Sequence, residues 1–171
     1  MPTSVTIPAG AVSSTFPLSS LADGQPDGNQ SVVLTASASG FVDGTTTVVV
    51  SDTDLPDLVV SGVTHLTGAT SRQRIEVRYR IGNQGLSAAT QSVLTRVYLS
   101  RDAVAGDDVL AAQSRVTETL AVGASVDRVE TLELPVEIGN YWVVVETDSE
   151  QTLDEVLENN NTAISSQPIV V

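Results

Sequence analysis

The stretch Tyr141–Thr162, YWVVVETDSEQTLDEVLENNNT, decides the fold that we expect for this chain. It begins with an apolar run, Tyr141–Val145, of the composition that strands favour. Carboxylates and three consecutive asparagines follow, and Thr162–Val171 then reads as another strand. Strand, acidic loop and strand is how an all-β module presents oxygen ligands or a binding surface at one end of a sandwich. The pattern favours a structural or adhesive module over an enzyme.

The composition points to an all-β protein of one large or two small domains. The chain has 171 residues, of which 41% are hydrophobic but only 4% aromatic, so valine, isoleucine and threonine carry the apolar pattern. Short alternating runs recur between Gly, Pro, Asn and Asp residues, and no long window has a helical period. We therefore predict antiparallel strands joined by short turns.

The charge limits the partners that the chain is expected to have. Its net charge is −13 and all eight basic residues are arginine, so we expect no nucleic-acid partner. No stretch is long and apolar enough for membrane insertion. Such a surface attracts cations, Ca²⁺ among them, although acidity that serves solubility outside the cell is an equally good interpretation. With no cysteine, the fold has neither disulfides nor thiolate metal sites.

We predict two parts, residues 1–54 and residues 55–171, joined through the proline-containing acidic linker Asp52–Asp57. The first part is a smaller, incomplete β segment with four expected strands: Ser4–Pro8, Ser14–Ser19, Ser31–Ser37 and Thr45–Ser51. The second is an immunoglobulin-like antiparallel β-sandwich of about seven strands. These are Leu58–His65, Arg74–Gly82, Ser92–Asp102, Val109–Leu120, Ser125–Leu134, Asn140–Thr147 and Thr162–Val171.

Residues 56–171 resemble the CARDB family, the cell-adhesion-related domain of bacteria. The resemblance is distributed over Pro56–Val60, Ile81–Gly85, Val97–Asp102, Gly106–Leu110, Tyr141–Trp142, Thr147–Asp148 and Glu158–Asn161, in the family's order and spacing. It implies an immunoglobulin-like sandwich in a bacterial surface or secreted protein, with a link to adhesion and without catalytic activity.

Residues 1–54 resemble the C-terminal half of a Calx-β-type repeat. The resemblance rests on Val5–Gly10, on Asp23 and Asp27, and on Val48–Asp54. It implies calcium binding by acids at strand ends, although some ligands of an intact site would come from the family's N-terminal strands.

A shared calcium site between the two parts follows from these expectations. A hairpin of Ser31–Ser37 with Thr45–Ser51 would gather the acids of the first part at one end, and the first strand of the sandwich begins near the loop after Thr147. Ca²⁺ takes 6–8 oxygen ligands. The expected ligands are Asp23, Asp27, Asp52, Asp54, Asp57, Asp148, Asp154, Glu155 and Glu158. The alternative is a solvated acidic loop and linker.

Two further features have simpler interpretations. A second acidic cluster, Asp102, Asp107 and Asp108, suits a turn as well as a metal site. Alternating arginines, from Arg72 to Arg80, suit a solvent face that pairs with acids across strands better than a face for anionic glycans.

The sequence gives no sign of an enzyme. Without cysteine or lysine there is no thiol or Schiff-base chemistry, and the single histidine, His65, has no serine in a nucleophile-elbow context. We expect Trp142 in the core, and nearly all the aromatic residues are needed there, which leaves nothing to form a platform for a sugar.

The function that we expect is a non-catalytic structural or adhesive module of a bacterial cell-surface or secreted protein, stiffened by Ca²⁺ at its acidic loops. The alternative is a carbohydrate- or protein-binding accessory module of a secreted enzyme. Expected partners are neighbouring domains of the same parent chain and a surface glycan or protein. The expected location is extracellular or on the bacterial surface.

Overall fold

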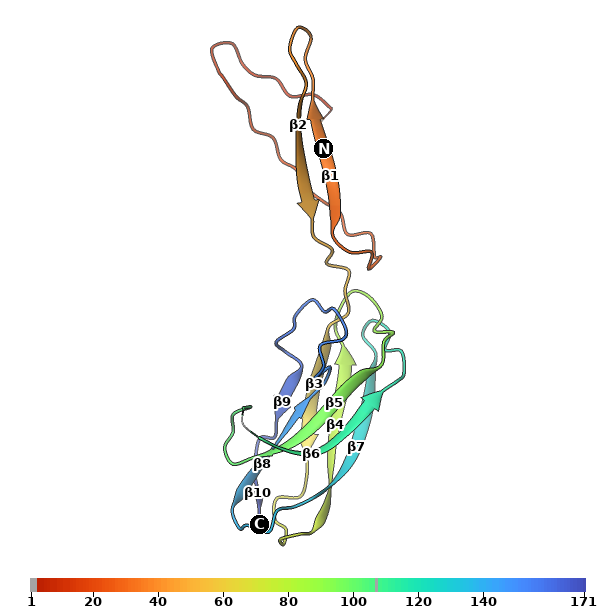
Figure 1. Cartoon of the computed structure of the whole chain (residues 1–171), viewed down its shortest axis with the longest axis vertical. Coiled ribbons are helices and arrows are strands. Elements are labelled where there is room, and N and C mark those ends of the chain that lie inside the picture. Colours follow the sequence, from red (N-terminus) through yellow and green to blue (C-terminus); the bar gives the residue numbers. More distant parts are fainter. Residues whose placement is uncertain (1–2, 107) are drawn as a thin grey trace. The chain divides into compact units, whose positions relative to one another are not determined.

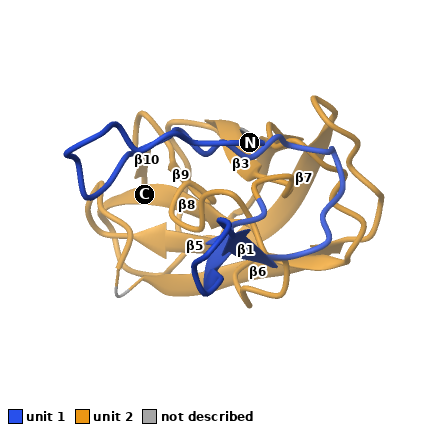
Figure 2. Cartoon of the chain, turned by 90° about the horizontal axis from the view of Figure 1, so that it is seen from above, with its two compact units in different colours: residues 1–52 blue, residues 53–171 orange. Residues whose placement is uncertain are grey.

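A computed structural model describes residues 3–106 and 108–171, so Asp107 of the second acidic cluster lies outside the described residues. The chain divides into two compact units, residues 1–52 (unit 1) and residues 53–171 (unit 2), which Figure 2 draws in separate colours. The predicted boundary, between residues 54 and 55, lies two residues from this division; that each part is a separate domain stays a prediction.

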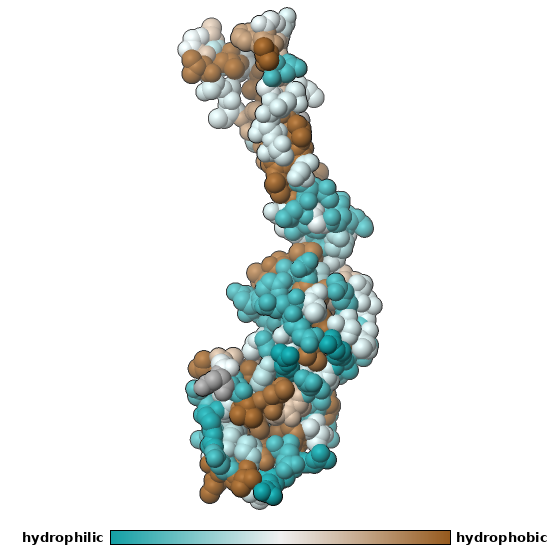
Figure 3. All heavy atoms as spheres, viewed as in Figure 1, coloured by the Kyte–Doolittle hydropathy of each residue, from teal (hydrophilic) through white to brown (hydrophobic). Residues whose placement is uncertain are grey.

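Unit 1 contains one β-hairpin. Its strands are β1 (Gln30–Ala36) and β2 (Gly44–Val50), paired antiparallel with Ser31 opposite Val49 (Figure 1). The other two predicted strands, Ser4–Pro8 and Ser14–Ser19, do not form. Their apolar side chains are exposed; Phe16, for example, keeps 45% of its surface accessible. Hydrophobic residues accordingly appear on the surface in Figure 3. Without apolar burial, little offsets the entropy of ordering a strand.

Unit 2 is an antiparallel β-sandwich, as predicted. One sheet has the order β3-β4-β7, and the other has the order β10-β8-β5-β6, with β9 also paired to β8 (Figure 1). The strands are β3 (Leu58–Thr64), β4 (Arg74–Asn83), β5 (Val93–Ser100), β6 (Val109–Val116), β7 (Ser125–Glu133), β8 (Asn140–Glu146), β9 (Thr162–Ile164) and β10 (Ile169–Val170). The strands β3 to β9 each begin within one residue of the start of a predicted strand. The eighth, β10, comes from the end of the last predicted strand.

The alternation of β4 builds one wall of the core. Ile75, Val77, Tyr79 and Ile81 are buried, while the residues between them face solvent. On the solvent face, the Arg80 guanidinium pairs with Asp127 across the strands at 2.7 Å, as the sequence indicated. The same core takes Leu58 and Leu132 from its own sheet and Val97, Val143, Val145 and Ile169 from the other.

The last predicted strand, Thr162–Val171, is split into β9 and β10. Pro168 lies between them and has no N–H with which to continue the ladder. Ser165 bridges the break, because its backbone N donates to the Val143 carbonyl at 2.8 Å and its Oγ accepts from the Val143 N at 3.0 Å. Both short strands therefore still pair with β8.

The prediction that Trp142 lies in the core is wrong. Tyr141, Val143 and Val145 point into the core, so Trp142 lies on the opposite face of β8, half-buried. An uninterrupted apolar run has no polar residue to mark its outer face, so the period of two does not determine which residues point inward.

Among the described residues, no helix is long and apolar enough to cross a membrane.

Candidate functional site

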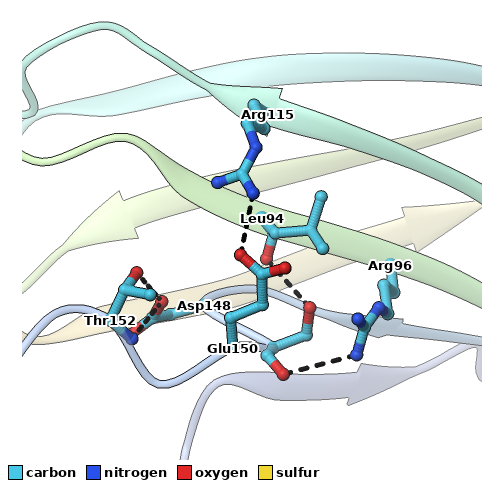
Figure 4. Close-up of polar contacts among 7 residues, drawn as sticks. Leu94, Arg96, Arg115, Asp148, Glu150 and Thr152 are labelled. Atoms are coloured by element: carbon cyan, nitrogen blue, oxygen red, sulfur yellow. Dashed lines mark hydrogen bonds and ion pairs between the residues drawn. The ribbon is translucent and has the colours of Figure 1, made fainter.

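The loop that follows β8 is fixed against the neighbouring strands (Figure 4). The Ser149 backbone N donates to the Leu94 carbonyl at 3.0 Å, and the Arg96 guanidinium donates to the Ser149 carbonyl at 3.4 Å. Glu150 forms an ion pair with Arg115 of β6 at 2.8 Å. The acidic loop therefore lies against β5 and β6 from its first turn.

Asp148 holds the first turn of this loop together. The residue is 1% exposed, and its carboxylate accepts hydrogen bonds from the Thr152 N at 3.1 Å and the Thr152 Oγ1 at 3.0 Å (Figure 4). The carboxylate also accepts from the Leu153 N at 3.0 Å. Its φ of +43° lies in the left-handed region, which aspartate tolerates better than most residues. Both carboxylate oxygens are thus occupied by donors of the loop itself.

Glu155 ties the second half of the loop to the first strand of the sandwich. Its carboxylate is 6% exposed; Oε1 accepts from the Leu58 backbone N, and Oε2 accepts from Asn161 Nδ2 at 2.5 Å. Beside it, the Val156 N donates to the Pro56 carbonyl at 3.0 Å. Glu155 thereby fixes the start of β3 to the residues that lead into β9.

Burial raises the pKa of Glu155 to about 7. The hydrogen bonds from Leu58 and Asn161 favour the charged form and limit the rise, whereas the nearby charges of Asp148 and Glu158 add to it. Glu158, an exposed residue, also accepts a hydrogen bond from the Glu155 backbone N at 2.8 Å.

Asp57 forms a second tie between the same segments. Its Oδ1 accepts from Asn160 Nδ2 at 2.8 Å, and its Oδ2 accepts from Gln84 Nε2 at 3.0 Å. The carboxylate is buried, so these two side-chain amides replace the water that it has lost.

Asn83 completes the pole at which the chain enters the sandwich. Its Oδ1 accepts from the Asp57 N at 3.1 Å and from the Gly85 N at 3.0 Å, and its Nδ2 donates to the Ser87 and Leu120 carbonyls at 2.7 and 2.9 Å. All the hydrogen-bonding capacity of this buried amide is used on backbone groups. The sequence showed Asn83 only as part of a family pattern, with no sign of these partners.

Gly85 is required at this pole by the close approach of the linker. A Cβ at this position would lie 2.5 Å from the Leu55 carbonyl oxygen and from the Asp57 N, which is closer than atoms can pack. The carbonyl of Leu55 accepts from the Leu86 N at 2.9 Å, which keeps the two segments together.

The structure separates the nine predicted calcium ligands by their surroundings. Within unit 2, Asp57, Asp148 and Glu155 are buried and bound to protein donors, Asp54 is buried, and Asp154 and Glu158 are exposed. Within unit 1, the Asp23 carboxylate accepts from the Gln25 N at 3.0 Å and Asp52 from the Gly28 N at 2.8 Å, while Asp27 is exposed.

In residues 3–106 and 108–171, no three His, Asp or Glu side chains form a group that could hold a metal. The calcium site therefore stays a prediction. Two amide oxygens near the buried carboxylates, Asn160 Oδ1 and Asn161 Oδ1, are buried and accept no hydrogen bond in the described structure.

The two sheets and the core between them define unit 2 as an immunoglobulin-like β-sandwich whose acidic loop is part of its scaffold. Residues 55–165 match the CARDB family, and the chain belongs to that family. CARDB domains occur in bacterial surface proteins, and the family is non-catalytic. The match begins at residue 55, so the resemblance of the preceding segment to a Calx-β-type repeat stays a prediction.

Solved structures with the same fold include the CARDB domain of a Pyrococcus furiosus protein. Its crystal structure, in complex with di-metal ions, is 23% identical and has a TM-score of 0.53, covering 68% of this chain and 89% of that one. Its solution structure is 22% identical with a TM-score of 0.52, covering 68% and 96%. Likeness at this level shows the fold alone.

A weaker likeness is to β-glucosidase 3B from Thermotoga neapolitana in complex with α-D-glucose. It is 18% identical with a TM-score of 0.46, and covers 68% of this chain but 16% of the enzyme. No curated protein matches the chain.

Proposed function

We propose that the chain is a non-catalytic structural and adhesive module of a bacterial cell-surface or secreted protein. The observation that carries this proposal is the CARDB match over residues 55–165, because CARDB domains occur in bacterial surface proteins. Its partners in this role are the neighbouring domains of its parent chain and a surface glycan or protein. Residues 1–54 serve in the same protein as part of a Calx-β-type repeat.

The hydrogen bonds of the acidic loop support a load-resistant module. Asp57 and Glu155 connect the entry of β3 with residues 160 and 161, just before β9, through side chains that lie about a hundred positions apart in sequence. Such ties hold the entry of β3 to the segment before β9 at one pole, whereas β10 pairs with the start of β8 at the other. A module that transmits tension between neighbouring domains needs this resistance to local unfolding.

Adhesion is tested by retention under flow. We expect beads that carry the whole chain to stay on bacterial or host-cell surfaces at shear rates that remove beads carrying an unrelated β-sandwich of similar net charge. Equal loss of both kinds of bead from every surface would contradict the adhesive role.

Calcium binding at the pole of Asp57 and Glu155 is a second proposed role. It is favoured by the two buried amide oxygens of Asn160 and Asn161, because Ca²⁺ accepts amide as well as carboxylate oxygens. The Pyrococcus furiosus CARDB domain, with its di-metal ions, supports the same idea by analogy. In this proposal the carboxylate oxygens of Asp57 and Glu155 coordinate the ion and also accept hydrogen bonds from the protein.

We expect thermal melts in millimolar CaCl₂ and in EDTA to differ by several degrees. A ligand that binds only the native state at a hundred times its Kd adds about 2.7 kcal/mol to the free energy of unfolding. The Asp57→Asn variant should lose this calcium-dependent increment, whatever its basal stability, and Glu133→Gln, which changes an exposed acid at the end of β7, should keep it. Identical melts with and without calcium would contradict the site.

A further inference from the structure

The outer face of the sheet that contains β5 and β8 presents two aromatic side chains. Val97 and Leu99 of β5 and Tyr141 and Val143 of β8 enter the core, so Tyr98 and Trp142 lie on the other face. Both are half-buried. The expectation that the core would leave no aromatic residue for a sugar platform is therefore wrong, because Tyr98 and Trp142 lie on this outer face.

A hollow lies over Tyr98 on this face. It has a volume of about 290 Å³, at the low end of the range for small-molecule sites, about 300–1,000 Å³. Its lining consists of Tyr98, Ala105, Gly106, Asp108, Val144, Glu146 and Thr162. The strands supply Tyr98, Val144, Glu146 and Thr162, and the segment between β5 and β6 supplies the other three.

The loop wall of the hollow is attached to the sheet. The Ser100 hydroxyl lies 3.3 Å from Asp102 Oδ1 and 3.5 Å from the Val104 carbonyl, so the end of β5 holds the start of this loop. Asp108 Oδ2 accepts from the Gly106 N at 3.1 Å, which positions the carboxylate at the hollow.

The hydrogen-bonding groups of the hollow are mostly acceptors arranged around an apolar base. The Tyr98 hydroxyl donates to Glu146 Oε2 at 3.1 Å, which orients both groups and leaves the carboxylate with further acceptor capacity. Asp108 also has acceptor capacity left, and the Thr162 hydroxyl can donate or accept. Val144, which is buried, and the Tyr98 ring supply apolar surface between these groups.

We propose that this hollow binds one ring of a neutral glycan. A sugar ring has hydroxyls that donate to carboxylates and an apolar C–H face that packs on an aromatic ring. The two carboxylates repel uronic acids and other anionic sugars, and the described residues that line the hollow include no basic one; Arg96 lies opposite Glu146 but outside this lining. The inference rests on the proposed adhesive function and names the ligand class that this function would use.

The test is an amide-resonance titration of the isotope-labelled whole chain with a panel of neutral sugars: glucose, galactose, mannose and their disaccharides. Glucuronic acid is the anionic control. We expect one or more neutral sugars to bind with a Kd of about 1 mM, as suits a ligand of so few atoms. The perturbed amides should be those of Tyr98, Ala105, Gly106, Val144, Glu146 and Thr162, and glucuronic acid should leave them unchanged.

Glu146→Gln is the informative variant, because it keeps the size of the side chain and removes its charge. Loss of a charge-assisted hydrogen bond should weaken binding about tenfold or more. Glu133→Gln, on the other sheet, is the matched control and should bind as the unmodified chain does. Amide spectra that match that chain elsewhere will show that each variant is folded.

Any of the following outcomes would overturn the proposal: no neutral sugar perturbs these amides at tens of millimolar, the perturbed amides lie elsewhere, or Glu146→Gln binds unchanged. Perturbation by CaCl₂ but by no sugar would also overturn it, since the hollow would then be a cation site. If the beads adhere although no sugar binds, the proposed function stands and only this ligand class falls.

Discussion

Replacing Asn83 by alanine should lower the free energy of unfolding of unit 2 by about 4 kcal/mol or more. The change leaves three buried backbone groups without their partner: the N–H groups of Asp57 and Gly85 and the carbonyl of Ser87. The Leu120 carbonyl loses one of its two donors and keeps the Ala89 N. Each unsatisfied buried group costs about 1–3 kcal/mol, less where water enters the space. With domains stable by about 5–15 kcal/mol, such a loss brings the unit close to unfolding.

The measurement is urea denaturation followed by the fluorescence of Trp142, the only tryptophan. Asn83→Asp separates the two bonds that Asn83 accepts from the two that it donates. The carboxylate can still accept from the Asp57 and Gly85 N–H groups, but it has no proton to donate to the Ser87 and Leu120 carbonyls. We expect it to be strongly destabilising despite its equal size. Asn140→Ala, at an exposed asparagine of β8, should change the stability by less than about 0.5 kcal/mol. A cost below about 1 kcal/mol for Asn83→Ala would show that the network contributes little.

The importance of Asn83 was only half visible in the sequence. Ile81–Gly85 stood out only as part of the family pattern after a predicted strand, and the structure shows that Gly85 is required by close backbone approach. The four partners of Asn83 come from the linker, its own turn and the segment before β7. Contacts over such separations depend on the three-dimensional fold, which a single sequence does not give.

Strands were predictable where polar and apolar residues alternate. In β4 the alternation marks both the strand and its buried face, and the structure confirms both. In β8 the strand was predicted correctly, but its uninterrupted apolar run left the buried face open, and Trp142 was placed on the wrong one. The error mattered for function, because it hid the aromatic face on which the proposed sugar site lies.

The first part of the chain shows the limit of local propensity. Ser14–Ser19 has the composition of a strand, yet it pairs with nothing in the described structure and its Phe16 is exposed. Strand propensity is realised through cross-strand packing, which the hairpin of β1 and β2 does not supply here: its own Val33 and Val49 remain exposed.

The acidic loop was located correctly, but its chemistry could not be predicted. Its carboxylates were interpreted as ligands or as solvated charges, whereas Asp148 and Glu155 are buried and accept hydrogen bonds from the loop and from β3. Only the second interpretation requires exposed acids, and calcium coordination stays a prediction. Asp and Glu are rarely buried without such partners. Three of the donors here are the backbone N–H groups of Thr152, Leu153 and Leu58, which no residue type reveals.

The stability of unit 2 should fall as the pH rises from about 4.5 to about 7, because of Glu155. Burial raises the pKa of its carboxyl from 4.5 to about 7, so between these values the folded protein binds a proton that the unfolded chain has released. Stability declines with pH wherever the folded state binds more protons. The contribution is fully present below pH 4.5 and lost above about pH 7, and a shift of this size corresponds to roughly 3 kcal/mol.

Glu155→Gln isolates this contribution from the titration of the other acids. The introduced amide is neutral at every pH, and its oxygen can still accept from the Leu58 N. Its NH₂ would meet the Nδ2 of Asn161, but a rotation of the Asn161 amide would present Oδ1, which has no partner in the described structure. We therefore expect the variant to be at least as stable as the unmodified chain at pH 8 and to lack its decline between pH 4.5 and 7.

The comparison needs urea titrations of both proteins at several pH values, with Glu133→Gln as a control for removing one of the many negative charges. The difference in free energy between Glu155→Gln and the unmodified chain should grow with pH over the stated range, while that of the control should stay nearly constant. If Glu155→Gln loses more than about 1 kcal/mol at pH 8, the charged carboxylate stabilises the pole. Its bonds to Leu58 and Asn161 would then outweigh the cost of burial, as they do for buried charges whose partners are well placed.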